Sequence, residues 1–136
     1  MKDCNYYSAF IAVSEDCPAA AGHIPPQKGK ERTIPELQYR MLANSPYKYT
    51  QEDVLFEIHA IRNNIPKGKK SAERLKYFSK GQACLRCSPL GKRYGWGIHF
   101  DTEGKAAIYG AQTAEYKRFA KDKSLKQMKA MASGKR

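Results

Sequence analysis

The chain has 136 residues, of which 41% are hydrophobic and 28% charged, and its 25 Lys and Arg against 13 Asp and Glu give a formal net charge of +12. This length suits one domain, and no linker rich in Pro, Ser or Gly divides it into halves that could each bury a core. No run approaches the roughly 18 consecutive apolar residues that a membrane-spanning helix needs, so we expect no membrane partner.

The positive charge is concentrated towards the C-terminus, where residues 117–136 carry a net charge of +7 and residues 1–116 carry +5. Clustered Lys and Arg can bind phosphates and release their counterions. Such a run is also typical of a solvated chain end that keeps a protein soluble. We favour the solvated end and retain weak, nonspecific binding of nucleic acid or another polyanion through this tail as the alternative.

The four cysteines of the chain are Cys4, Cys17, Cys84 and Cys87. The first residues hold only a short apolar run, which is followed directly by Glu15 and Asp16 and is unlike an export signal. We therefore expect a cytoplasmic protein whose cysteines remain thiols and form no disulfide framework.

The first predicted strand is Tyr6–Val13, which is rich in aromatic and β-branched residues and runs into a turn. Residues 18–32 contain Pro and Gly without a regular period, and predict a surface loop. A helix is predicted from Thr33 to about Asn44, with Thr33 as its N-cap and Glu36 bonding back to it.

From Val54 the apolar residues alternate with period two, so the segment Val54–Arg62 is predicted to be a second strand. Thr50 precedes it and could cap a further turn of helix. A short helix is then predicted to open at Ser71 and to stop at Gly81, a residue type that suits the left-handed stop position.

The region 93–110 predicts a β-hairpin with strands Tyr94–Phe100 and Lys105–Tyr109, because the four residues between them are typical of a hairpin loop. If Phe100 opposes Lys105, bulky and small side chains separate onto opposite faces. The bulky face then holds Trp96, Ile98, Phe100, Ala107 and Tyr109. A helix or a ligand could approach the backbone on the other face, which holds Gly95, Gly97, His99, Ala106 and Ile108.

A last helix is predicted to begin after Thr113, which can act as its N-cap. This order of elements predicts a single α+β domain over residues 1–122, in which a mainly antiparallel sheet of four or five strands has helices packed on one side. Residues 123–136 are expected to form a separate basic tail that is either a short helix or frayed.

Three strings mark the sequence: NYYSAFIAVSEDCP near the start, YKYTQEDVLFEIHAIRN, and FSKGQACLRCSPLGKRYGWGIHFDTEGKAAIY. Together they resemble an uncharacterised bacterial family that is catalogued only as a domain of unknown function. The resemblance extends to about Tyr116, so the tail beyond Asp122 looks like an addition, and Cys87 stands where the family tends to have a small residue such as alanine. The resemblance implies a small cytoplasmic protein with no assigned activity, and it supplies no catalytic residues.

Cys84 and Cys87 have the two-residue gap of a zinc or redox pair. A structural zinc site needs four ligands, and the other two cysteines and His23 offer no second closely spaced pair. Thioredoxin-type chemistry needs the pair at the start of a helix, and the Ser-Pro that follows argues against a helix there. We therefore expect thiols whose spacing is due to chance, with no metal and no cofactor.

The weak catalytic candidates are His99 on the small-residue face of the hairpin and Glu57 or His59 on the predicted second strand. An imidazole beside a carboxylate can act as a general base. A strand histidine is more often a half-buried residue bonded to a backbone carbonyl, and no GxSxG, HExxH or phosphate-loop pattern is present. The sequence leaves open whether the protein is an enzyme.

Cationic and aromatic residues lie together before and within the first hairpin strand, and these ligand-binding candidates are Arg86, Lys92, Arg93, Tyr94 and Trp96. If exposed, they could stack on bases and bind phosphates. If buried, the two aromatic residues belong to the core. The loop at 88–93 is the preferred place for a site, since a connection that carries Arg and Lys readily contacts anions.

Two functions remain open from the sequence. The preferred one is a small non-enzymatic binding module for an anionic ligand, a nucleic acid or a protein. The alternative is a small enzyme with a histidine-containing pocket beside the face of Gly95 and Gly97. Polyanion binding would depend steeply on salt, whereas an enzyme would enclose a histidine with a displaced pKa.

Overall fold

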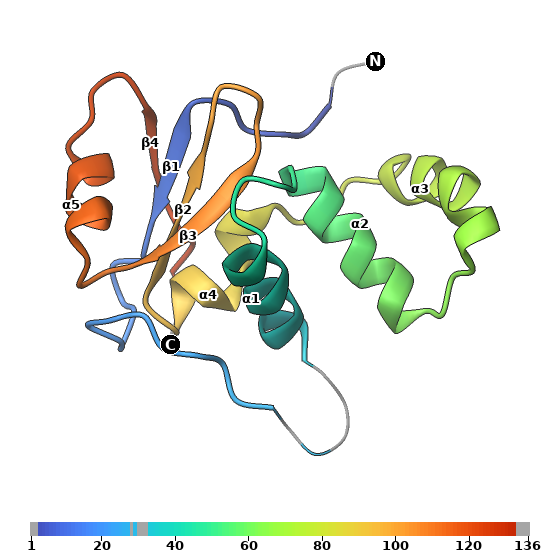
Figure 1. The fold of residues 1–136 in the computed structure, drawn as a ribbon, viewed down its shortest axis with the longest axis horizontal. Helices are drawn as coiled ribbons and strands as arrows, with labels where there is room; N and C mark the ends of the chain where they lie inside the picture. The colour runs from blue at the N-terminus through green and yellow to red at the C-terminus, as the bar shows by residue number, and fades with distance from the viewer. Residues whose placement is uncertain (1–2, 28, 30–32, 133–136) are drawn as a thin grey trace.

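Figure 1 shows the fold of the protein in a computed structural model, which describes residues 3–27, 29 and 33–132. The described chain forms one four-stranded sheet with the strand order β3-β2-β1-β4. The pairs β1–β2 and β2–β3 are antiparallel and β1–β4 is parallel, so the sheet is mainly antiparallel, as predicted. The strands are β1 (Ala9–Ala12), β2 (Trp96–Phe100), β3 (Ala106–Gly110) and β4 (Lys126–Lys129).

Most of the helices lie on one side of this sheet. Helices α1 and α4 contact it directly, α2 packs against α1, and α3 lies outermost beyond α2 (Figure 1). None of the described helices is long and apolar enough to cross a membrane. The helices on this side are α1 (Ile34–Asn44), α2 (Gln51–Arg62), α3 (Lys70–Phe78) and α4 (Pro89–Lys92), with 3₁₀ turns η1 (Lys67–Lys69) and η2 (Leu85–Cys87) before the last two.

The main core lies between the sheet and these helices. The register pairs Ile11 of β1 with Ile98 of β2, and Phe100 points to the same face two residues along. Leu42 of α1 and Val54 of α2 are buried in the same cluster. Each such side chain contributes roughly 1.5–3 kcal/mol through the burial of apolar surface, so this layer holds the two halves of the chain together.

The opposite face of the sheet is covered by α5 (Ala114–Ala120), which begins after Thr113 as predicted. Phe10 of β1 lies edge-on to the Tyr116 ring, with centroids 5.1 Å apart, and also contacts Phe119. The single α+β domain is confirmed. The prediction that helices pack on one side only is wrong, because the small residues on the second face leave room for α5.

The segment 54–62 is part of helix α2 and not the strand that its alternating pattern predicted. The helix begins with a capping box, in which the Thr50 hydroxyl accepts from the Asp53 N–H and the Asp53 carboxylate accepts from the Thr50 N–H. Val54 faces the main core, while Phe56 contacts Tyr77 of α3. A helix that is buried on more than one side carries apolar residues at spacings that imitate a strand.

The hairpin is present, but Phe100 pairs with Ala106 and not with Lys105. The loop is longer by one residue because Asp101 N–H donates to the Lys105 carbonyl at 2.9 Å, which places Lys105 in the turn. A shift of one residue exchanges the faces of the second strand. Ala106 therefore enters the main core, and Tyr109 joins the face that also carries His99.

The basic segment that was expected to be helical or frayed contains strand β4. Lys126 N–H donates to the Ser8 carbonyl and Ala130 N–H to the Ala12 carbonyl, at 2.9 and 2.8 Å, so β4 completes the free edge of β1. Ala130 is buried. Up to residue 132, the segment that was predicted to be a separate tail therefore belongs to the sheet. Residues 133–136 are not among the residues that the structure describes.

The remaining local predictions have mixed outcomes. Thr33 caps α1 through the Glu36 N–H, as predicted, although the Glu36 carboxylate pairs with Arg40. Helix α3 begins one residue before Ser71 without a side-chain cap, and Gly81 does not adopt the left-handed conformation that was predicted for it. The N-cap of α1 was thus predicted correctly, whereas the start and the stop signal of α3 were not.

Candidate functional site

A groove of about 910 Å³ lies between α1, the second half of α2, α3 and the segment 82–89. The parts that form it are distant in the sequence. The chain runs away from the sheet through α2 and α3 and returns towards it through the segment 82–89, so these elements enclose the groove together with α1 (Figure 1). Its described lining residues include no Asp or Glu. They are Thr33, Ile34, Pro35, Gln38, Leu55, Ile58, His59, Arg62, Asn63, Tyr77, Gln82, Ala83, Cys84, Cys87, Ser88 and Pro89.

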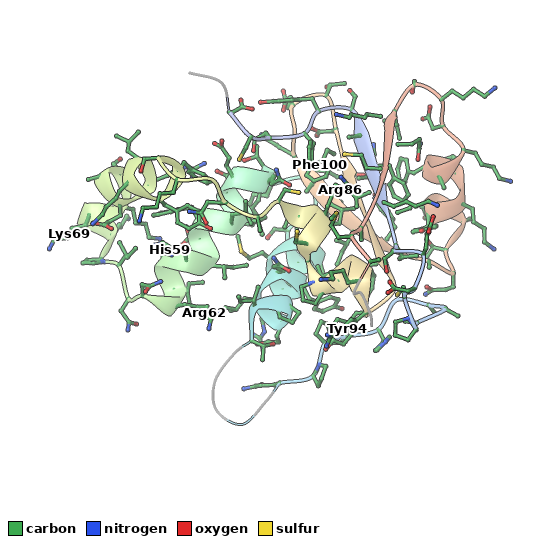
Figure 2. All side chains as sticks on the ribbon, turned by 180° about the vertical axis from the view of Figure 1, so that it is seen from behind. His59, Arg62, Lys69, Arg86, Tyr94 and Phe100 are labelled. Carbon is green, nitrogen blue, oxygen red and sulfur yellow. The ribbon has the colours of Figure 1, made fainter. Side chains whose placement is uncertain are left out.

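The cationic part of the groove comes from the last turn of α2. Arg62 and His59 lie on the same side of this helix, three residues apart, and both line the groove (Figure 2). The Arg62 side chain is exposed, and its guanidinium makes no hydrogen bond or ion pair with a described residue. Among the described residues, the groove therefore presents a positive charge without an ion-pair partner beside an imidazole.

His59 is held in place by two neighbours. Its ring lies against that of Tyr77, with centroids 4.4 Å apart, and its Nδ1 accepts from Asn63 Nδ2 at 3.2 Å. An amide nitrogen can only donate, so the neutral imidazole carries its proton on Nε2 and can donate from there. Partial burial raises the pKa of Tyr77, which therefore stays a neutral phenol on the groove wall.

The floor of the groove is polar and ordered. The Ser88 hydroxyl donates to Gln38 Oε1 at 2.5 Å and accepts from the Leu90 N–H at 3.1 Å. Ser88 thus caps α4, so the helix that was excluded for this position on the evidence of the Ser-Pro sequence does form. The amide nitrogen of Gln38 has no partner among the described residues and is available as a further donor.

The two cysteines of the CxxC motif line the same groove. Cys84 is half-buried at the start of η2, and Cys87 is exposed at its end. Within the described part of the chain, no group of three or more His, Cys, Asp or Glu residues is placed to hold a metal ion. The donors that the groove does offer suit a ligand bound by hydrogen bonds and charge.

The predicted aromatic ligand-binding residues lie elsewhere, at the start of β2. Trp96 donates its Nε1–H to the His23 carbonyl at 2.9 Å and packs against Tyr39 of α1. The Tyr94 ring lies edge-on to that of His23, and its label in Figure 2 marks its position beside the loop before α1. Both residues are half-buried against this loop.

The predicted cationic residues are also outside the groove. Arg86 points towards β4 and donates its Nε–H to the Lys129 carbonyl at 2.8 Å. Lys92 is half-buried at the end of α4, and Arg93 is exposed just beyond it. The structure therefore does not bring these five candidates together around one cavity.

His99 lies on the sheet face that α5 covers. Its Nδ1 is 2.9 Å from the Tyr47 hydroxyl, which in turn is 2.7 Å from the Tyr109 hydroxyl. A Cβ atom at Gly97 would lie 2.6 Å from the Tyr116 ring, so no space for a ligand remains beside this strand. Of the two arrangements that the small residues allowed, a close helix or a ligand pocket, the structure has the helix.

The other catalytic candidates are not near His99. Glu57 accepts from Lys70 Nζ at 2.6 Å and does not line the groove, whereas His59 does. No carboxylate among the described residues lines the groove beside His59. The arrangement therefore does not form the pair of imidazole and carboxylate that a general base of this kind would use.

Arg62 and Gln38 were not among the residues singled out from the sequence. Arg62 follows His59 by one helical turn, a spacing that would have pointed to one surface had 51–62 been read as a helix. The sequence signal that could have identified this helix was the capping box formed by Thr50 and Asp53. Gln38 carried no signal, because its role depends on the packing of α1 against the 82–89 segment.

Comparisons with known proteins find one family. No curated protein matches the chain. No solved structure matches it either. A family model described as a family of unknown function, DUF6157, matches residues 1–136, and so includes the basic C-terminal segment that had looked like an addition. The chain therefore belongs to the DUF6157 family.

Proposed function

We propose that this protein is a small, non-enzymatic binding module whose groove holds an anionic ligand with an apolar body. The observation that carries the proposal is the Arg62 guanidinium, which no described residue pairs, beside His59 in a groove of about 910 Å³ whose described lining residues include no carboxylate. An exposed guanidinium that no described residue pairs can form a bidentate, charge-assisted contact with a carboxylate or phosphate of a ligand.

The groove offers two kinds of contact. Arg62, His59 Nε2 and the Gln38 amide nitrogen are donors for a carboxylate or phosphate. The walls between them are apolar or aromatic and include Ile34, Ile58 and Tyr77. Pockets that combine apolar walls with a few polar groups bind small molecules by burying the apolar part and orienting the charged part.

The test uses matched ligands on the full chain. Benzoate and phenyl phosphate carry both a ring and a charge, acetate and inorganic phosphate carry only the charge, and benzamide carries only the ring. Binding is measured by chemical-shift perturbation and by the rise in melting temperature that a ligand of the folded state causes. We expect the two aryl anions to bind more tightly than the other three compounds.

The control compares two single-charge changes. Arg62→Ala should weaken binding of phenyl phosphate by tenfold or more, which corresponds to about 1.4 kcal/mol. Arg93→Ala removes the same charge from a residue outside the groove and should leave the affinity unchanged. Equal losses in the two variants would indicate a general charge effect, and absence of binding by any aryl anion would remove the proposal.

A second binding surface is favoured by a different observation, the exposed cations on α5 and β4. Lys117, Lys121 and Lys126 form no ion pair with a described residue. Arg118 lies over the Phe119 ring, 5.4 Å from its centroid. We propose that this surface binds nucleic acid or another polyanion weakly and without sequence preference, because clustered cations release counterions from phosphates.

We also propose that the protein acts in the bacterial cytoplasm. In support, all four cysteines are free thiols, and a reducing compartment such as the cytoplasm keeps thiols unpaired. Cell fractionation with an antibody against the chain tests this location, and recovery from the periplasm or the medium would contradict it.

A further inference from the structure

The backbone from Cys84 to Cys87 closes a tight turn, in which the Cys87 N–H donates to the Cys84 carbonyl at 3.0 Å. A turn of this kind brings its first and fourth Cα atoms within about 7 Å, and a disulfide requires a Cα separation of about 4.4–6.8 Å. Both cysteines line the same groove. We propose that Cys84 and Cys87 form a reversible intrachain disulfide, which makes this turn a redox-responsive site on the groove wall.

The turn is held rigidly by its surroundings. Leu85 is 1% exposed in the main core, and its N–H donates to the Gln51 side chain at 2.8 Å. The Arg86 carbonyl accepts from the Met131 N–H at 2.8 Å. Ser88, directly after the pair, is buried. These contacts hold the backbone on both sides of the pair, so the turn that brings the two cysteines together is fixed by its surroundings.

The reaction is a thiol–disulfide exchange with a low-molecular-weight disulfide such as oxidised glutathione. The exposed Cys87 loses its proton and attacks one sulfur of the oxidant, which releases one glutathione thiolate. The half-buried Cys84 then attacks the mixed disulfide at the Cys87 sulfur, and a second glutathione leaves. The two cysteines lose two electrons, the oxidant gains them, and the two protons pass to the two glutathione thiolates.

The disulfide is suited to reversal and not to structural support. Only Leu85 and Arg86 lie between the cysteines, so the closed ring is short and restricts the unfolded chain little. Cys87 stays exposed to a reducing thiol. Accessible disulfides that add little to stability are the ones that cells reduce readily.

The other thiols are poorer partners. Cys17 does not line the groove, and its thiol faces the Ala19 carbonyl at 3.7 Å in the loop after β1. Cys4 is nearer, but partial burial and the Glu52 carboxylate raise the pKa of its thiol to about 11, so little thiolate is present at neutral pH. The turn therefore favours pairing within the CxxC motif.

The experiment uses the full folded chain in glutathione buffers of increasing oxidised fraction. Remaining thiols are blocked with N-ethylmaleimide in denaturant, and the chain is digested with trypsin, which cleaves between the two cysteines after Arg86. If trypsin cleaves after Arg86, we expect peptides 81–86 and 87–92 to appear joined by a disulfide. If it does not, we expect peptide 81–92 with a mass lower by two hydrogens. Dithiothreitol should convert both products to the reduced peptides. Cys4 and Cys17 should carry the blocking group throughout.

Two variants complete the test. Cys17→Ser should oxidise like the wild type, and Cys87→Ser should lose the cross-link while keeping the wild-type circular dichroism spectrum. A link from either CxxC cysteine to Cys4, a stable glutathione adduct without an intrachain link, or no oxidation of the folded chain at any buffer ratio would each overturn the proposal. None of these results depends on whether the groove binds an anion.

Discussion

The imidazole of His99 lies flat on the ring of Phe119, with the ring centroids 4.0 Å apart and the planes 11° from parallel. His99 is on the central strand β2 and Phe119 on α5, so this contact fixes the helix that covers the second face of the sheet. The Tyr47 hydroxyl fixes the other edge of the imidazole. A histidine that sequence patterns nominated for catalysis is therefore part of the packing.

Removal of the Phe119 ring should destabilise the fold. Phe119→Ala deletes the stacking on His99 and the contact with Phe10, and we expect a loss of about 2–3 kcal/mol in the free energy of unfolding, since the ring is half-buried. Urea titration measures the loss. Lys117→Ala, on the exposed side of the same helix, should change stability by less than about 0.5 kcal/mol. Similar effects of the two changes would mean that α5 is only loosely attached.

His99 should make stability depend on pH. Burial lowers the pKa of His99, and Asp101 and Asp122 oppose this effect. The unfolded chain then binds the proton more readily, so stability is complete above the ordinary pKa of about 6.5 and is lost as the pH falls below it. Urea titrations between pH 7.5 and 5.5 should show this fall in the wild type and in His23→Gln. The fall should be smaller in His99→Gln, and an unchanged slope in that variant would contradict the assignment.

Gly97 should not tolerate a side chain. Its Cβ would lie 2.6 Å from the Tyr116 ring and 2.7 Å from the Phe10 ring, so Gly97→Ala should cost about 1–3 kcal/mol of stability. Gly68 has no atom within 4 Å of its Cβ position, and Gly68→Ala should be neutral or slightly stabilising. Thermal unfolding of both variants measures the difference, and a stable Gly97→Ala chain would mean that α5 can move away from the sheet.

Deletion of residues 124–136 should lower the melting temperature by more than about 10 °C. The deletion removes β4, its ladder to β1 and the buried Ala130. A full-length chain in which Lys123 is replaced by Ala keeps these contacts and should melt as the wild type does. A truncated chain with an unchanged melting temperature would show that β4 is dispensable.

Binding of polyanions should follow charge and not the integrity of the sheet. In the full chain, changing Lys117, Lys121 and Lys126 to Ala keeps β4 and should flatten the plot of log affinity against log salt by up to about two units for a single-stranded oligonucleotide. Fluorescence anisotropy at several salt concentrations measures this slope. If Arg93→Ala abolishes binding and the triple change has no effect, the polyanion binds at the start of the hairpin and not at α5 and β4.

The parts of the fold that could be predicted are those with local signals. The hairpin and the caps at Thr33 and Thr113 act within a few residues; both caps lie where the sequence placed them, and the hairpin loop is one residue longer than predicted. Strand β4 has the sequence KQMK and no local β signal, because what makes it a strand is the free edge of β1. Helix α2 was misread because its apolar residues face two layers.

The candidate groove could be predicted only in fragments. His59 and the CxxC cysteines were noted individually, but the surfaces that bring them together come from α1, α2 and the 82–89 segment. Their relative placement depends on tertiary packing, such as the bond between Ser88 and Gln38. Arg62 can be placed beside His59 only once α2 is known to be a helix.

The pairing of β1 has a consequence for synthesis of the chain on the ribosome. Phe10 lies between His99 on one side and Gln127 on the other, so both hydrogen-bonded neighbours of this early strand emerge late. Until then its two edges have no partner, and contacts over such separations form slowly. The sheet is therefore expected to assemble only after almost the whole chain has left the exit tunnel, and the edges of the N-terminal strand stay open until then.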